Sequence, residues 1–191
     1  MKLWFLTHAD VRIDPDVPVP DWGLSDRGRA RHSAFAERVR GIGSVFCSFE
    51  RKAAEGAAII ADVHGLEPSR VLALHENDRS ATGYLPPEHF EAMADAFFAH
   101  PRQSQQGWER AIDAQYRIVG ALRQVVADAP RTGDILVVSH GAVGALLRAH
   151  VLGDSISRRH DQPRGKGGGH CMVFDLPGWQ LLRDWTAIEV V

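Results

Sequence analysis

The chain has 191 residues, of which 45% are hydrophobic and 24% charged, as in an ordinary globular protein with a sizeable core. Its 22 basic and 24 acidic side chains leave a formal net charge of −2, which argues against a general nucleic-acid binder. No run approaches 18 apolar residues and no signal-peptide pattern opens the chain, so we expect no membrane segment and a cytoplasmic location. Cys47 and Cys171 lie in apolar runs and are expected to be buried thiols in a reducing compartment.

The hydrophobic pattern alternates strands and helices along the chain. Prolines 15, 18 and 20 forbid regular structure in the loop 8–22, and Ser25 is a suitable N-cap for the helix that follows. The expected strands are 2–7, 44–48, 71–74 and 134–139, with a hairpin of 170–176 and 180–185; the expected helices are 26–40, 50–64, 88–99, 108–127 and 142–152. This order predicts an α/β fold, a three-layer α/β/α sandwich with a mainly parallel central sheet. We expect one domain over 1–191, with a small cap at 76–107.

Two of the strands stop at a histidine. The run 2–7 ends at His8, and the run 134–139 ends at His140, after which a small-residue turn leads into a helix. Ligands of an open α/β sheet bind in the crevice outside the carboxyl ends of its strands. We therefore expect His8 and His140 to face each other across one pocket, one as a nucleophile and the other stabilising a developing anion.

Three further stretches carry candidate polar groups. Arg51 and Lys52 stand at a predicted helix start, against the helix dipole, which is a mild sign that one of them binds a phosphate or carboxylate. Glu76 follows a strand end and could act as a general acid, although most lone carboxylates lie on the surface. The glycine-rich run 165–169 matches neither phosphate-binding fingerprint, so we interpret it as a loop at the pocket rim with Lys166 as a weak anion contact.

Taken together, these motifs resemble the histidine phosphatase superfamily, which has the phosphoglycerate-mutase-like fold. Residues 137–141 (Val-Val-Ser-His-Gly) match the late motif of that family in full, and Leu24-Ser25 with Gly28 match its first helix. Cys47-Ser48-Phe49 stand where the family has Ser-Ser-Pro, and Lys52 falls on the family's second arginine. The first motif is half present, because Thr7 replaces the arginine of Arg-His-Gly.

The resemblance implies the roles of these residues. His8 would accept the phosphoryl group, His140 would stabilise its charge, and Glu76 would protonate the leaving oxygen and then activate water. The implied phosphate-binding residues are Lys52, Arg79, Arg51, Arg12, Gly141 and Ser48, where Arg12, Arg51 and above all Arg79 are candidates to replace the missing arginine. No metal and no cofactor are needed. A lost charge-assisted hydrogen bond of roughly 1.5–3 kcal/mol corresponds to a ten- to hundredfold weaker activity.

Three functions remain open. The first is a phosphomonoester hydrolase that acts through a phosphohistidine on a small phosphorylated substrate or on a phosphohistidine. The short 76–107 segment favours this hydrolase over a mutase, since mutases of the family have longer insertions. The second is a catalytically impaired phospholigand-binding module of the same fold. The third is a metal-dependent hydrolase using His75, Glu76, His160 and Asp161, although their spacing resembles no known metal motif. We expect no nucleic-acid or membrane partner, and the sequence carries no signal for an oligomeric state.

Overall fold

The computed structural model of the chain describes residues 1–165 and 167–191, so the expectation for Lys166 lies outside the described residues. Its strands are β1 (Lys2–Thr7), β2 (Ile42–Cys47), β3 (Ser69–Arg70), β4 (Asp134–Ser139), β5 (His170–Asp175) and β6 (Gln180–Ala187). Its α-helices are α1 (Asp26–Ala36), α2 (Arg51–Val63), α3 (Pro87–Ala99), α4 (Ala111–Asp128) and α5 (Gly141–Val151). None of the described helices is long and apolar enough to cross a membrane.

The six strands form one sheet in the order β3-β2-β4-β1-β5-β6. The first four run parallel, and β5 pairs antiparallel with both β1 and β6, which confirms the predicted mainly parallel sheet. β1 and β4 lie side by side at its centre and are almost wholly buried, as their continuous apolar runs require.

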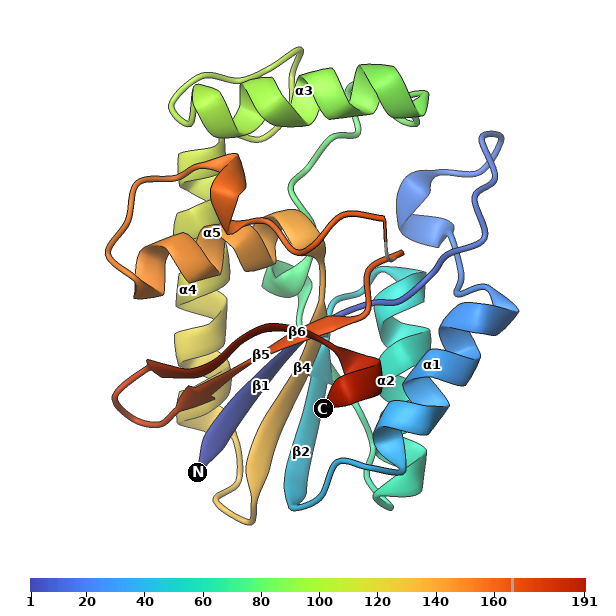
Figure 1. Ribbon diagram of the computed structural model, residues 1–191, viewed down its shortest axis with the longest axis vertical. Coiled ribbons are helices and arrows are strands. Elements are labelled where there is room, and N and C mark those ends of the chain that lie inside the picture. The colour runs from blue at the N-terminus through green and yellow to red at the C-terminus, as the bar shows by residue number, and fades with distance from the viewer. Residues whose placement is uncertain (166) are drawn as a thin grey trace.

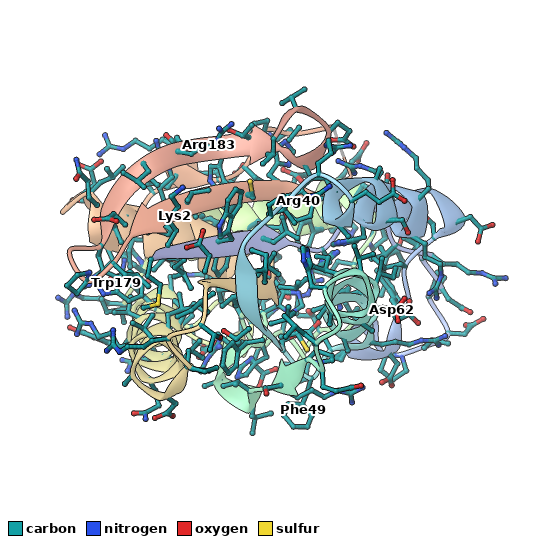
Figure 2. The ribbon with its side chains drawn as sticks, turned by 90° about the horizontal axis from the view of Figure 1, so that it is seen from below. Lys2, Arg40, Phe49, Asp62, Trp179 and Arg183 are labelled. Carbon is teal, nitrogen blue, oxygen red and sulfur yellow. The ribbon has the colours of Figure 1, made fainter. Side chains whose placement is uncertain are left out.

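Helices cover both faces of the sheet (Figure 1). α1 and α2 pack on one face around Phe35, Ile60 and Val138, and α4 and α5 pack on the other around Leu122, Ile135 and Leu147. The charged residues Lys2, Arg40, Asp62 and Arg183, which are labelled in the view from below, are exposed to solvent (Figure 2). The predicted three-layer sandwich is confirmed, with the carboxyl ends of the parallel strands open toward α3.

The predicted strand 71–74 is wrong. β3 pairs with β2 only at Ser69 and Arg70, and Leu72–Leu74 form a 3-10 turn in which the Leu74 amide donates to the Val71 carbonyl. Leu72 is 68% exposed, so the run does not have the two buried faces that its apolar composition suggested. The turn directs the chain away from the sheet edge and carries the residues after it toward the strand ends.

The turn after His8 is packed tightly against α1. A Cβ on Gly28 would lie 2.2 Å from the Asp10 carbonyl oxygen, and the Gly28 amide donates to the N-cap hydroxyl of Ser25. We expect Gly28→Ala to lower the free energy of unfolding by roughly 1–3 kcal/mol, because the turn must shift to admit the methyl group.

Urea denaturation followed by circular dichroism measures this change. Gly120→Ala in α4 is the matched control, since nothing lies within 4 Å of the added atom, and it is expected to stabilise by up to about 1 kcal/mol. Equal effects of the two substitutions would show that the contact between Gly28 and Asp10 is not tight.

Candidate active site

The two strand-end histidines are neighbours. Thr7 is in register with Ser139 across β1 and β4, and the His8 amide donates to the Ser139 carbonyl at 3.1 Å. The next residue of each chain segment is the histidine, and the ring centroids of His8 and His140 are 5.3 Å apart in an edge-to-face arrangement. The parallel register therefore places the two imidazoles next to each other at the carboxyl ends of β1 and β4.

The surroundings of His8 keep its ring neutral. Burial, followed by the charge of Lys52, lowers the pKa of His8 to about 4. Its Nδ1 lies 3.0 Å from the Ala9 carbonyl oxygen, which can only accept, so Nδ1 carries the proton. The lone pair is then on Nε2, which makes this atom the nucleophile of the ring.

His140 precedes the first residue of α5 and has no exposed surface. Burial lowers its pKa well below the ordinary value, against the opposing charge of Glu50. Its Nε2 lies 2.7 Å from the Ser48 hydroxyl and 3.3 Å from Glu50 Oε1. The polar edge of this ring is thus directed at the end of β2.

Glu76 caps the start of α5. Its Oε1 accepts from the amides of Asn77 at 3.0 Å and Val143 at 3.1 Å, and its Oε2 accepts from Ala142 at 3.1 Å. Burial raises the pKa of Glu76, and the nearby Glu50 carboxylate raises it further. Since Oε2 has the single donor, it is the oxygen better able to carry a proton.

Glu50 belongs to this group of residues, although the sequence pattern did not single it out. Its Oε2 accepts from Lys52 Nζ, and its Oε1 accepts from the Glu76 amide at 2.8 Å. Burial opposes its ionisation, but the charge and hydrogen bond of Lys52, together with the hydrogen bond from the Glu76 amide, hold the pKa of Glu50 well below the usual range. The available signal was its place at the junction of a strand end and a helix start, two residues before Lys52.

Two of the four predicted cations reach this group. The amine of Lys52 is buried and also donates to the Val19 carbonyl at 2.9 Å. Arg79 lies over the Phe90 ring, 4.8 Å from its centroid, and no carboxylate of the described chain forms a salt bridge with it. Its charge contributes to the lowered pKa of both His8 and His140.

The structure does not bring the other two cations to the site. Arg51 is 62% exposed and pairs with Glu55, and the expectation that it contacts phosphate is not supported. Arg12 is exposed, and its amide donates to the Gly23 carbonyl in the loop that precedes α1. Both side chains lie at the surface, where water can accept hydrogen bonds from their guanidinium groups.

Thr7, which stands where the family that the sequence resembles has arginine, contacts Gln162. Its hydroxyl accepts from the His170 amide at 3.0 Å and lies 2.8 Å from Gln162 Oε1, to which it donates. A Cβ on Gly141 would lie 2.7 Å from Gln162 Nε2, so the absence of a side chain there makes room for this amide. Gln162, which nothing in the sequence indicated, is therefore held beside the start of α5.

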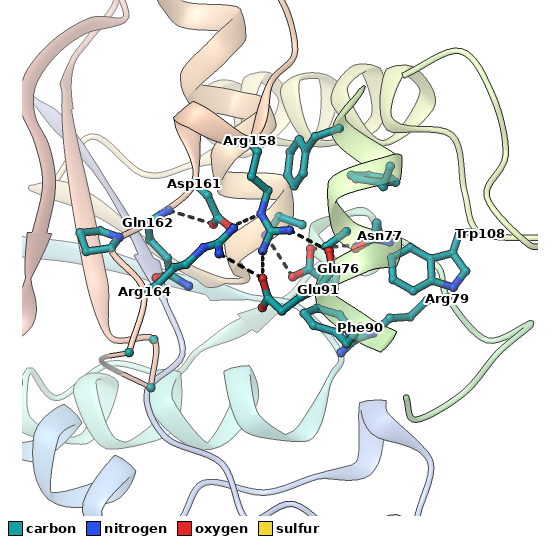
Figure 3. A pocket seen from close by; sticks show the side chains of 18 residues that line it. Glu76, Asn77, Arg79, Phe90, Glu91, Trp108, Arg158, Asp161, Gln162 and Arg164 are labelled. Carbon is teal, nitrogen blue, oxygen red and sulfur yellow. Dashed lines mark hydrogen bonds and ion pairs between the residues drawn. The ribbon is translucent and has the colours of Figure 1, made fainter. Parts of the chain in front are cut away.

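Two cavities meet at the loop that contains Glu76, Asn77 and Arg79, since these three residues line both. The smaller, of about 260 Å³, lies between this loop, α3 and residues of the segments 158–165 and 167–168, and Figure 3 shows its labelled side chains. The larger, of about 690 Å³, lies between the same loop and residues 15–21. A ligand entering either cavity would reach the Glu76 carboxylate.

Two of the four residues considered for a metal site have other partners. His160 Nδ1 is 2.7 Å from an Arg148 guanidinium nitrogen, and Asp161 pairs with Arg158. Within residues 1–165 and 167–191, no three His, Cys, Asp or Glu side chains are grouped so that they could hold a metal ion. Cys47 and Cys171 are buried free thiols, as predicted, and burial raises the pKa of each.

Comparison with known proteins finds one matching family and solved structures of the same fold. The family model "Histidine phosphatase superfamily (branch 1)" matches residues 7–184, while no curated protein matches the chain significantly. A mycobacterial glucosyl-3-phosphoglycerate phosphatase solved with inorganic phosphate is 20% identical, with 100% of this chain and 99% of that chain covered and a TM-score of 0.80. The same mycobacterial phosphatase with VO3 is 22% identical, with coverages of 97% and 98% and a TM-score of 0.78. Bacillus stearothermophilus YhfR is 20% identical, with coverages of 98% and 99% and a TM-score of 0.78.

Proposed function

The chain belongs to the histidine phosphatase superfamily, branch 1, and on this premise we propose that it is a phosphomonoester hydrolase that acts through a phosphohistidine. The observation that carries the proposal is the pair of His8 and His140, 5.3 Å apart at adjacent strand ends, with Glu76 at the same helix start. A small phosphorylated molecule, or a phosphohistidine, is the substrate class that we propose. Structures of similar fold include a phosphatase solved with inorganic phosphate, which supports this assignment.

The proposed reaction has two steps. In the first, His8 Nε2 attacks phosphorus, the P–N bond forms, the P–O bond to the leaving group breaks, and Glu76 gives its proton to the departing oxygen. In the second, Glu76 takes a proton from water, the new hydroxide oxygen bonds to phosphorus, and the P–N bond breaks to regenerate neutral His8. His140, Lys52 and Arg79 would stabilise the charge on the transferring oxygens.

We also propose that residues 76–107 act as a cap. α3 lies across the top of the molecule in Figure 1, and Phe97 and Phe98 pack with Trp108 and Leu146 to hold it over α5. The smaller cavity lies beneath this segment, which would limit the access of water and the size of the leaving group.

The pH dependence of turnover follows from the two shifted groups. Nucleophilic His8 must be neutral, so kcat/KM should fall as the pH drops through its pKa of about 4. Glu76 must be protonated to act as an acid, and its pKa is raised, so activity should fall again above the ordinary carboxyl range. We expect a bell-shaped profile with an optimum on the acidic side of neutrality.

Steady-state kinetics with an aryl phosphate between pH 3.5 and 9 would check the profile. In Glu76→Gln the upper limb should disappear, because the titrating acid is gone. An optimum above pH 8 in the unsubstituted protein would contradict the assignment of Glu76 as general acid.

A phospholigand-binding module without efficient turnover is the second candidate, and specific contacts favour it. Thr7 supplies no charge, and the carboxylate of Glu50 already pairs with Lys52 and faces His140.

Incubation with an aryl phosphate in the presence of a chelator, with acid quenching and mass analysis of the His8 peptide, separates the two functions. Turnover with a phosphorylated peptide supports the hydrolase, whereas binding of orthophosphate or vanadate without either supports the module.

A further inference from the structure

Asn77 has a buried donor that no described residue satisfies. It is the only asparagine of the sequence, it is 5% exposed, and its Nδ2 has no hydrogen-bond partner among the described residues. A buried amide N–H without an acceptor destabilises a folded protein, and nearly all such groups in proteins are paired. An exception calls for an explanation, and an acceptor supplied by a ligand is one.

The backbone of the loop around Asn77 is held in place by side chains of α4 and of the segment before it. Arg117 donates to the carbonyls of Ala73 at 3.0 Å, His75 at 2.8 Å and Glu76 at 3.2 Å, and it forms an ion pair with Glu109. Glu109 in turn donates its amide to the Asp78 carbonyl and accepts from the Asp78 amide. The backbone on both sides of Asn77 is therefore fixed.

Asn77 lies in the wall that a bound substrate would contact. Asn77 lines both cavities, and its own amide donates to Glu76 Oε1, so its side chain starts beside the carboxylate proposed as the general acid. Figure 3 shows Asn77 next to Glu76 at the wall of the smaller cavity, with Trp108 and Arg79 nearby. A bound molecule that reached Glu76 would bring its oxygens to this wall.

We propose that Asn77 is a substrate-binding residue whose Nδ2 donates a hydrogen bond to an oxygen of the phosphorylated substrate. The acceptor is either an oxygen of the phosphoryl group or an oxygen of the leaving group. A neutral amide suits this place, because a lysine or arginine beside Glu76 would lower the pKa of that carboxyl and remove its proton. The inference rests on the proposed function and adds a residue to it.

The substitution Asn77→Leu tests the proposal, since leucine has a similar size and no polar atom. Without substrate, the variant is expected to unfold at the same temperature or a higher one, because an unsatisfied donor has been removed. In the same variant, kcat/KM for an aryl phosphate, or the affinity for vanadate, is expected to fall by about tenfold. Gln124→Leu, which removes an exposed amide on α4, is the control and should change neither quantity.

The ligand used in the assay identifies the acceptor. Weaker binding of vanadate and orthophosphate would assign Asn77 to a phosphoryl oxygen, whereas a higher KM for the ester with unchanged oxyanion binding would assign it to the leaving group. Asn77→Asp, which keeps the shape and replaces the donor by an acceptor, should lose at least as much as Asn77→Leu.

Two outcomes would overturn the inference while the proposed function stands: turnover of Asn77→Leu equal to that of the unsubstituted protein, or a lower unfolding temperature that accompanies the loss and marks Asn77 as structural. If the unsubstituted protein neither turns over an ester nor binds vanadate, the proposed function fails and this inference fails with it.

Discussion

Replacing His8 by alanine is expected to reduce phosphate release from an aryl phosphate by more than about a thousandfold, since removal of a nucleophile abolishes the covalent route. The ring is partly exposed at the end of β1 and carries its lone pair on Nε2. Its pKa of about 4 leaves it neutral at the pH of the assay. Release of phosphate in chelator-containing buffer, and the mass of the peptide that contains residue 8, measure the effect.

The control for this substitution is His150→Ala, which removes an exposed imidazole from α5. It is expected to retain full activity and the phosphorylated peptide. Far-ultraviolet circular dichroism should be the same for all three proteins. If His8→Ala kept activity within tenfold of the unsubstituted chain, His8 would not be the nucleophile.

The two central strands could be predicted to the residue because their environment is simple. β1 and β4 are buried on both faces, so each needs an uninterrupted apolar run, and each run ends where a polar histidine leaves the sheet. The run 71–74 is also apolar, but it has no strand to pair with, because the neighbouring strand β2 ends at Cys47, opposite Arg70. Composition cannot distinguish these cases, because pairing depends on residues far away in the sequence.

The same reasoning explains which site residues the sequence missed. His8 and His140 directly follow strand ends, so their positions are set by local structure, whereas Glu76 follows the 3-10 turn at Leu72–Leu74. Glu50 joins the site through its contact with His140, and Gln162 joins it through a hydrogen bond with Thr7, which is 155 positions away in the chain. The directions of such side chains depend on the folded arrangement, and a pattern of residue types does not encode them.

The Glu50–Lys52 ion pair is the electrostatic feature that distinguishes this site from a cluster of cations. A phosphoryl group that approaches Lys52 meets the Glu50 carboxylate, which is already paired with the lysine. The two anions repel each other, and at a separation of about 4 Å the repulsion is several kcal/mol at an effective dielectric near 20. Phosphate binding therefore requires that Glu50 turn away from Lys52 or that Arg79 supply the larger share of positive charge. The pair also makes a separate contribution to the stability of the fold.

We expect Lys52→Met to lower the free energy of unfolding by about 3–5 kcal/mol at neutral pH, because it leaves the Glu50 carboxylate buried without its cation. The side chains of Lys52 and Glu50 are 5% and 11% exposed, so solvent replaces little of the lost interaction. In the variant the pKa of Glu50 should rise, so the difference from the unsubstituted protein should shrink as the pH falls and Glu50 takes up a proton. Urea denaturation at pH 7 and pH 5 measures both effects.

Two further variants show whether the loss comes from the unpaired carboxylate. Arg51→Ala removes the neighbouring cation, which is 62% exposed, and is expected to cost less than about 1 kcal/mol. The double substitution Lys52→Met with Glu50→Leu should recover most of the stability, since neither charge is then buried. If the double variant were as unstable as Lys52→Met alone, the loss would come from the packing of the lysine stem, and the buried charge of Glu50 would not be its cause.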